Sequence, residues 1–241
     1  MTLVRRRQAT VVVDGRNATG ETVRLEARQA VVTLPLGVLQ AKFPGSGAVI
    51  FDPPLREKED ALGKLAMGPV VRLVLQFDST FWENSSLMGN GALRDLHFLF
   101  TRNPVFPTFW TTMPLRLPLL VAWCAGSGAA AKARWSQPEL EQEALRSLSR
   151  ALRLPEPALT RHFVRSYFHD WQADPFSWGA YSYVLAGGMG AQSSLATPLF
   201  GRLFFAGEAT QSDGHHATVH GAFHSGIRAA SEALESSQQL S

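Results

Sequence analysis

Near its carboxyl end the chain reads Arg202-Leu203-Phe204-Phe205-Ala206-Gly207-Glu208-Ala209-Thr210. The apolar part of this run is short and closes on a glycine, which is typical of a buried strand. Glu208 follows directly, so we expect a carboxylate in the loop at the end of that strand.

The segment after this loop, residues 217–230, has the spacing of a helix that is unusually rich in small side chains. These are Ala217, Gly221, Ala222, Ser225, Gly226 and Ala229. Each helical glycine lowers helix propensity by roughly 1 kcal/mol relative to alanine, and the usual reason is the close approach of a backbone or a ligand. The free N–H groups at the start of such a helix are suited to face an acceptor.

This strand, loop and helix resemble the carboxyl-terminal signature of the flavin-dependent amine oxidases, among them the polyamine oxidases and the lysine-specific histone demethylases. The matching letters are LFFAGEAT, ATVHGA and SG-x-R-x-A. The resemblance implies that FAD is the cofactor and lies across the helix start, with Gly207 among the residues that bind it and Glu208 near its ribityl-pyrophosphate arm. It places the N–H groups of Thr218 and Val219 at the pyrimidine end of the flavin ring, and Val4 against the adenine. A tightly packed strand and helix without a ligand is the alternative.

Length and composition limit the class of protein. The 241 residues are 45% hydrophobic and 18% charged with a net charge of +3, so one large or two small globular domains are expected. The longest basic run is Arg5-Arg6-Arg7, so nucleic-acid binding is not indicated. The single cysteine, Cys124, excludes an internal disulfide and favours a reducing, cytoplasmic setting. No apolar run reaches the roughly 18 residues of a membrane span, so no membrane partner is expected.

Periodicity and turn residues predict the secondary structure between these landmarks. Strands are predicted at 9–14, 22–27, 30–34, 70–77 and 161–168, and three more between residues 96 and 124. A helix is predicted over 52–66 with Asp52 as its cap, and a second over 136–152. Ser136 and Glu139 have the spacing of a capping box for the second helix.

The resemblance implies an α/β fold in which an incomplete FAD-binding domain, residues 1–40 and 169–241, carries an inserted α+β substrate domain with a mixed sheet, residues 41–168. Family members begin with a dinucleotide-binding βαβ unit, and no G-x-G-x-x-G loop precedes Val4 here. We therefore expect this chain alone to bind FAD weakly or not at all, with an upstream segment missing or supplied by another chain.

An aromatic loop follows the last strand of the predicted substrate domain. Its pattern resembles the family sequence W-x-x-D-P followed by G-x-Y-S-Y-V, which implies that Trp171, Phe176 and Tyr181 flank the flavin and form a slot for the amine. Thr218 would shape the slot with Tyr181. Ring faces attract a cationic nitrogen and offer an apolar wall to the neutral amine. Ordinary core aromatics are the alternative.

Arg72 departs from the family pattern. The resemblance implies a lysine at this strand position, where it holds a water near flavin N5. Arginine keeps the positive charge, but it is bulkier, its fork geometry differs and it does not lose its proton at working pH. The efficiency of oxidation is therefore open, and a surface strand arginine is the alternative.

The function implied is FAD-dependent oxidation of a polyamine-like or other primary or secondary amine. Hydride transfer from the carbon beside the nitrogen to the flavin gives an imine that hydrolyses to an aldehyde, and oxygen is reduced to hydrogen peroxide. A small-molecule amine and oxygen are thus the expected partners. The alternatives are a truncated, non-catalytic remnant or binding module, and a different flavoprotein such as a desaturase.

Two further patterns are weak. His216, His220 and His224 have helical spacing, but no acidic partner matches them and no metal is expected. Residues 126–131 fit G-x-G-x-x-A after an apolar strand, but the next good strand begins only near Arg161, so a nucleotide loop is not expected.

Overall fold

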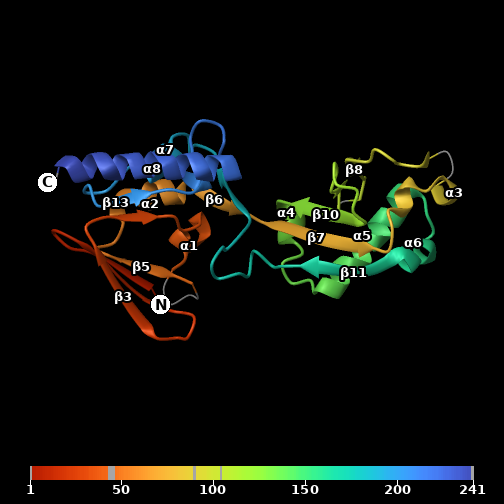
Figure 1. Cartoon of the computed structure of the whole chain (residues 1–241), viewed down its shortest axis with the longest axis horizontal. Helices are drawn as coiled ribbons and strands as arrows, with labels where there is room; N and C mark the ends of the chain where they lie inside the picture. Colours follow the sequence, from red (N-terminus) through yellow and green to blue (C-terminus); the bar gives the residue numbers. More distant parts are fainter. Residues whose placement is uncertain (1, 43–46, 89–90, 104, 240–241) are drawn as a thin grey trace. The chain divides into compact units, whose positions relative to one another are not determined.

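The structure is a computed structural model that describes residues 2–42, 47–88, 91–103 and 105–239. The chain forms two compact units: the first comprises Met1–Gly68 and Gln172–Ser241, and the second comprises Pro69–Trp171 (Figure 1). Both units combine helices with sheets, so the expected α/β class is confirmed. The assignment of 1–40 and 169–241 to FAD binding and of 41–168 to substrate binding stays a prediction.

The amino-terminal part of the first unit forms a four-stranded sheet. Its strands are β1 (Thr2–Arg6), β2 (Val11–Arg16), β3 (Thr22–Ala27) and β5 (Val49–Asp52), in the order β3-β2-β1-β5. The three neighbours in sequence pair antiparallel, whereas β5 runs parallel to β1. The predicted strand at 22–27 has the observed bounds, and the strand predicted at 9–14 begins two residues later.

The carboxyl-terminal run forms the buried strand that the sequence predicts. It is β13 (Leu203–Phe205), which pairs in parallel with β4 (Ala30–Val32) and is 1–2% exposed at all three residues. A second two-stranded sheet pairs β12 (Tyr181–Val184) antiparallel with β6 (Leu65–Gly68). Two segments far apart in sequence are thereby joined twice by backbone hydrogen bonds.

The helix predicted over 52–66 is shorter at both ends. Asp52 is the last residue of β5, where its backbone pairs with Arg5, so it is not the cap. Helix α2 spans Arg56–Gly63 with Leu55 at its N-cap, and Leu65 already begins β6. The two prolines at 53 and 54 separate the strand from the helix because proline fits neither interior.

Three further helices complete the first unit. They are α1 (Leu36–Gln40), α7 (Ala191–Ala196) and the long α8 (Val219–Gln239). Figure 1 shows α8 running beside β13, and Ala229 of α8 is fully buried with Phe204 and Ala206 of that strand segment. The small residues of this helix therefore let it approach the strand closely.

The second unit is built on a five-stranded antiparallel sheet. The order is β11 (Phe163–Phe168), β7 (Val70–Phe77), β10 (Leu119–Ala125), β9 (Thr108–Thr111) and β8 (Phe98–Phe100). The predicted strand at 70–77 and the three expected between 96 and 124 are confirmed. The strand predicted from Arg161 begins at Phe163, because helix α6 (Glu156–His162) precedes it.

One face of this sheet is covered by α5 (Gln137–Leu152), which begins at the predicted capping box of Ser136 and Glu139. The core between helix and sheet includes Leu73, Leu75, Phe109, Leu120, Leu140, Ala144 and Leu148, each fully buried. Short helical turns complete the unit: η1 (Phe81–Glu83), α3 (Ser85–Met88) and α4 (Ser127–Ala130).

The glycine-rich stretch at 126–131 does not form a dinucleotide loop. It makes the single turn of α4 after β10, and β10 is antiparallel to both of its neighbours. A nucleotide loop of this kind needs a parallel βαβ unit. The absence of a nucleotide loop here therefore follows from topology as well as from spacing.

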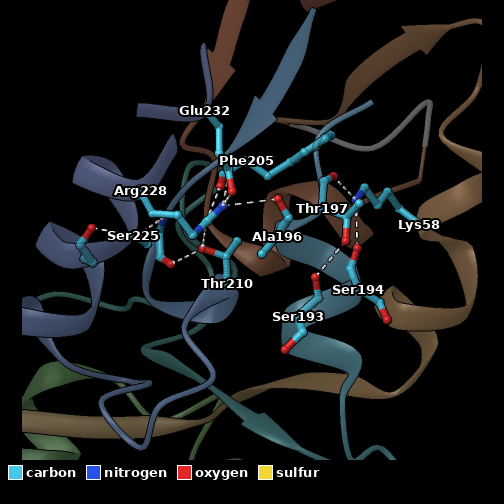
Figure 2. Close-up of polar contacts among 12 residues, drawn as sticks. Lys58, Ser193, Ser194, Ala196, Thr197, Phe205, Thr210, Ser225, Arg228 and Glu232 are labelled. Carbon is cyan, nitrogen blue, oxygen red and sulfur yellow. Dashed lines mark hydrogen bonds and ion pairs between the residues drawn. The ribbon is translucent and has the colours of Figure 1, made fainter. Parts of the chain in front are cut away.

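Lys58 of α2 is a buried cation in the first unit, with only 1% of its surface exposed. Its Nζ donates to the backbone oxygens of Ser194 at 2.7 Å and Thr197 at 2.5 Å, at the carboxyl end of α7 (Figure 2). It also lies 4.7 Å from the ring centroid of Phe205. The pKa of Lys58 is lowered to about 8, chiefly by burial and also by the charge of Arg228, while Glu57 and Glu232 oppose the shift.

The Lys58→Met variant tests this burial through pH. An unfolded lysine binds its proton up to a pKa near 10.4, so between pH 8 and 10.5 the unfolded chain holds more protons than the folded one. The free energy of unfolding of the wild type should therefore rise across this window relative to Lys58→Met, by up to about 3 kcal/mol. Urea unfolding at several pH values measures this. Lys64→Met, which removes an amine that is 44% exposed, should show no such rise, and a constant difference for Lys58→Met would contradict the assignment.

The two glycines of α8 predict opposite effects of alanine. A Cβ on Gly221 would lie 2.0 Å from the carbonyl oxygen of His215, whereas a Cβ on Gly226 would meet nothing within 4 Å. Gly226→Ala should raise the free energy of unfolding by about 0.5–1 kcal/mol, and Gly221→Ala should lower it by about 1–3 kcal/mol. Chemical denaturation of both variants checks the pair. Equal effects would mean that backbone approach does not explain Gly221.

Candidate functional site

The turn after β13 is open to the approach of another molecule at Gly207. Its φ of 124° lies in a region that other residues rarely adopt, and a Cβ placed there would meet nothing within 4 Å. The Gly207 N–H donates to Oγ of Ser225 at 2.8 Å, and its carbonyl accepts from the N–H of Thr210 at 3.0 Å. The glycine is thus needed for its backbone conformation, while the space beside it stays free.

Glu208, the first residue of η3 (Glu208–Thr210), is already engaged by the protein. Its carboxylate accepts from the N–H of Ser182 at 3.1 Å and from its hydroxyl at 2.7 Å. It also accepts from the N–H of Ala217 at 2.9 Å, a residue with a φ of 59°. Glu208 therefore ties β12 to the loop that leads into α8, and contact with the ribityl-pyrophosphate arm stays a prediction.

The first turn of α8 presents N–H groups without acceptors. Thr218 caps the helix: its Oγ1 accepts from the N–H of Gly221 at 3.0 Å and donates to the carbonyl of His215 at 2.6 Å. In the part of the chain that the structure describes, the N–H groups of Thr218, Val219 and His220 have no hydrogen-bond acceptor. The side chain of Val219 is 83% exposed. The end of a 21-residue helix with free donors suits a ligand with oxygen or nitrogen acceptors.

These features fit the flavin that the resemblance implies. The open space at Gly207 and the free donors at the start of α8 belong to the same unit and are joined through the Glu208 carboxylate. A ring system with carbonyl and nitrogen acceptors would satisfy donors that are otherwise without partners. The roles of Gly207, Thr218 and Val219 in holding FAD stay predictions.

The other predicted residues of the first unit differ in setting. Val4 is 8% exposed and packs in a core cluster with Val11, Val32 and Leu203. Tyr181 pairs across from Gly68, whose missing Cβ would lie 3.5 Å from the tyrosine ring.

The predicted aromatic slot is divided between the two units. Phe176 is 76% exposed in a turn of the first unit, where its N–H donates to the Asp174 carboxylate at 2.7 Å. Trp171 belongs to the second unit, where its ring lies 4.4 Å from that of His169 and is 43% exposed. A slot shared by Trp171 and Phe176 therefore stays a prediction.

Arg72 lies on β7 in the second unit, on the sheet face opposite α5. It pairs directly with Trp123 of β10, and a row of rings continues from there across the sheet. The ring centroids of Trp123 and Trp110 are 6.5 Å apart, and those of Trp110 and Phe98 are 6.2 Å apart. Arg72 is exposed, so this face combines a cation with aromatic surface.

Three residues that bind the motif together were not predicted as site residues. The hydroxyl of Ser182 donates to Glu208, and the hydroxyl of Ser225 accepts from the N–H of Gly207. Arg228 donates to the carbonyl of Phe205 at 2.7 Å and to Oγ1 of Thr210 at 3.2 Å (Figure 2). A usable signal existed for two of them. Ser225 and Arg228 are three residues apart in the helix that follows the motif, so their side chains lie on the same face of α8.

Two kinds of feature are absent from the described ranges. No group of three or more His, Cys, Asp or Glu side chains is arranged there to hold a metal ion. Nor is any helix in those ranges long and apolar enough to cross a membrane.

Comparison with known proteins identifies the family. The model of a family described as flavin containing amine oxidoreductase matches residues 2–234. Lysine-specific histone demethylase 2 of Homo sapiens is 33% identical over 212 residues, covering 86% of this chain and 24% of that protein. Peroxisomal N(1)-acetyl-spermine/spermidine oxidase of Homo sapiens is 30% identical over 232 residues, covering 88% of this chain and 43% of that protein.

A solved structure agrees at the level of the fold. Wild-type putrescine oxidase bound to putrescine superposes with a TM-score of 0.75 and 22% identity, covering 97% of this chain and 47% of that one. The chain thus spans less than half the length of each of these relatives. Since the family model matches nearly every residue, the chain belongs to the flavin-containing amine oxidoreductases.

Proposed function

We propose that this chain contributes to an FAD-dependent amine oxidase that acts on a polyamine-like or other primary or secondary amine. The observation that carries the proposal is the joined pair of an open Gly207 turn and the free donors of Thr218 and Val219 at the start of α8. When bound, FAD supplies the two-electron acceptor that takes hydride from the carbon beside the amine nitrogen and is reoxidised by oxygen, with release of hydrogen peroxide. The imine product hydrolyses to an aldehyde.

The chain's own residues would bind and orient the reactants. The N–H groups of Thr218 and Val219, with the partial positive charge of the helix end, favour negative charge that develops nearby. Val4 and Gly207 would contact other parts of the cofactor, and Glu208 holds the intervening loop in place. Trp171, Phe176 and Tyr181 would offer ring faces to the amine, and Arg72 would hold the water that attacks the imine.

A non-catalytic binding module is the second candidate, and the arginine at position 72 favours it. A guanidinium is larger than an ammonium and holds its donors in a rigid plane, so a water fixed by it would sit differently. This candidate predicts that the chain binds flavin or amine and releases no peroxide.

The first experiment measures flavin binding at equilibrium and then activity. FAD titration, followed by flavin fluorescence and the visible absorption band, should show saturable binding that is too weak to survive desalting. The loaded chain is then screened with diamines, polyamines and monoamines for peroxide release. Absence of saturable binding would mean that the Gly207 turn and the free donors of α8 do not hold FAD in this chain alone, and binding without peroxide would favour the second candidate.

A variant pair at the start of α8 tests the donor role directly. Proline is tolerated in the first helical position and removes only the N–H, so Val219→Pro should weaken FAD binding about five- to tenfold, the value of one hydrogen bond. Val219→Ala keeps the N–H and should bind FAD like the wild type. Equal affinities for the two variants would exclude this N–H as a flavin contact.

Arg72→Lys tests the water-holding role. If the guanidinium misplaces the water, the lysine should raise the rate of peroxide release per bound flavin by about tenfold or more. Arg72 is exposed, so stability should change by less than about 0.5 kcal/mol. Arg165→Lys, at another exposed arginine on the same face of the sheet, serves as the control. A rate that is unchanged in Arg72→Lys, or raised equally in both variants, would show that the guanidinium does not misplace the water.

A further inference from the structure

The turn after β13 is held from one face of α8 at both of its ends. Ser225 is fully buried, and its Oγ accepts from the N–H of Gly207 at 2.8 Å while donating to the carbonyl of Ala222 at 2.7 Å. One turn further along the helix, Nη2 of Arg228 donates to the carbonyl of Phe205 at 2.7 Å and to Oγ1 of Thr210 at 3.2 Å. Figure 2 shows these side chains converging on the turn.

We propose that Ser225 and Arg228 are positioning residues that fix the backbone of the Gly207-to-Thr210 turn in one conformation before any ligand arrives. The purpose of this arrangement, a rigid wall for the cofactor, rests on the proposed function. The fixing itself is a property of the free protein.

A glycine at the ligand side of the turn makes such fixing necessary. Gly207 has no side chain to restrict its backbone, so it has more conformations to lose on ordering than any other residue. Its N–H donates to Ser225 and its carbonyl accepts from the Thr210 hydroxyl at 2.9 Å, so the peptide units on both sides of Gly207 are held. Conformational entropy that the turn loses on folding is not lost again when a ligand binds, which is the basis of preorganisation.

Arginine is suited to this task because its planar fork reaches several acceptors at once. Besides the turn, Nη1 of Arg228 donates to the carbonyl of Ala196 at 3.3 Å and to the carboxylate of Glu232 at 3.0 Å. Its Nε–H is buried and has no partner among the described residues. The guanidinium is therefore placed for the carbonyl of Phe205 and the hydroxyl of Thr210 even though one of its own donors stays unsatisfied.

Glu232 provides a matched control. It pairs with Arg228 at helical i, i+4 spacing, and among the described residues its carboxylate accepts no hydrogen bond from the turn. Glu232→Gln removes the ion pair but leaves the arginine its bonds to Phe205 and Thr210. Arg228→Lys keeps the charge and replaces the fork by a single ammonium, which reaches fewer of the acceptors.

The test is amide hydrogen exchange of the flavin-free chain, read by mass spectrometry in peptides that cover residues 203–212. Ser225→Ala and Arg228→Gln should each speed exchange in this segment about five- to tenfold, the effect of one lost hydrogen bond. Arg228→Lys should fall between Arg228→Gln and the wild type, and Glu232→Gln should match the wild type. Exchange in 11–16, strand β2 of the same unit, should not change in any variant.

Two results would overturn the proposal. The first is unchanged exchange of 203–212 in both Ser225→Ala and Arg228→Gln. The second is an equal rise in 203–212 and 11–16, which would mean general destabilisation of the first unit. If Ser225→Ala or Arg228→Gln does not fold, the comparison of Arg228→Lys with Glu232→Gln tests the proposal instead, because only Arg228→Lys should speed exchange in 203–212. Failure of the wild type to bind added FAD would count against the proposed function alone, because the exchange experiment contains no flavin.

Discussion

The parallel pairing of β13 with β4 is the constraint on which the first unit depends. Leu203, Phe204 and Phe205 lie opposite Ala30, Val31 and Val32, so the chain must return after 170 residues to complete this pair. Parallel strands put their carboxyl ends at the same edge of a sheet. The Gly207 turn therefore begins where β4 gives way to Pro35 and α1, and α8 can close over the strand only once it is in place.

Two cations at the carboxyl end of α7, the buried Lys58 and the partly buried Arg228, dominate the electrostatics around this strand. Lys58 and Arg228 approach that helix from α2 and α8 and donate to its last carbonyls, which have no partner within the helix. Cations are favoured at this end of a helix by the orientation of its peptide dipoles. Only Glu232 forms an ion pair with either cation among the described residues, so the carbonyl oxygens carry much of the compensation.

Local patterns predicted the elements well where one strong signal acts. The capping box at Ser136, the strand predicted at 70–77 and the apolar run of β13 all appear in the structure. The error at Asp52 arose because an acidic residue before two prolines is equally compatible with a strand end and a helix cap. Strand pairing decided between them, and pairing is a tertiary property.

The sequence predicted which residues form the candidate site, but it did not predict the hydrogen bonds that connect them. Gly207, Glu208 and Thr218 could be singled out from the motif, but the carboxylate of Glu208 reaches Ser182, 26 residues away. No spacing rule connects those two residues, because the contact depends on the pairing of β12 with β6.

One unit is a single continuous segment and the other is two segments, and this difference affects the order in which they can fold during synthesis. The second unit is one continuous segment, Pro69–Trp171, and all five strands of its sheet come from within it. The first unit is split, and β13 and α8 are made last. Synthesis proceeds from the amino end. The second unit can therefore bury its core in the nascent chain before β13, the partner of β4, has been made. The apolar edge of β4 therefore stays unpaired in the nascent chain, and open to wrong pairing, until the segment from β13 to α8 has emerged.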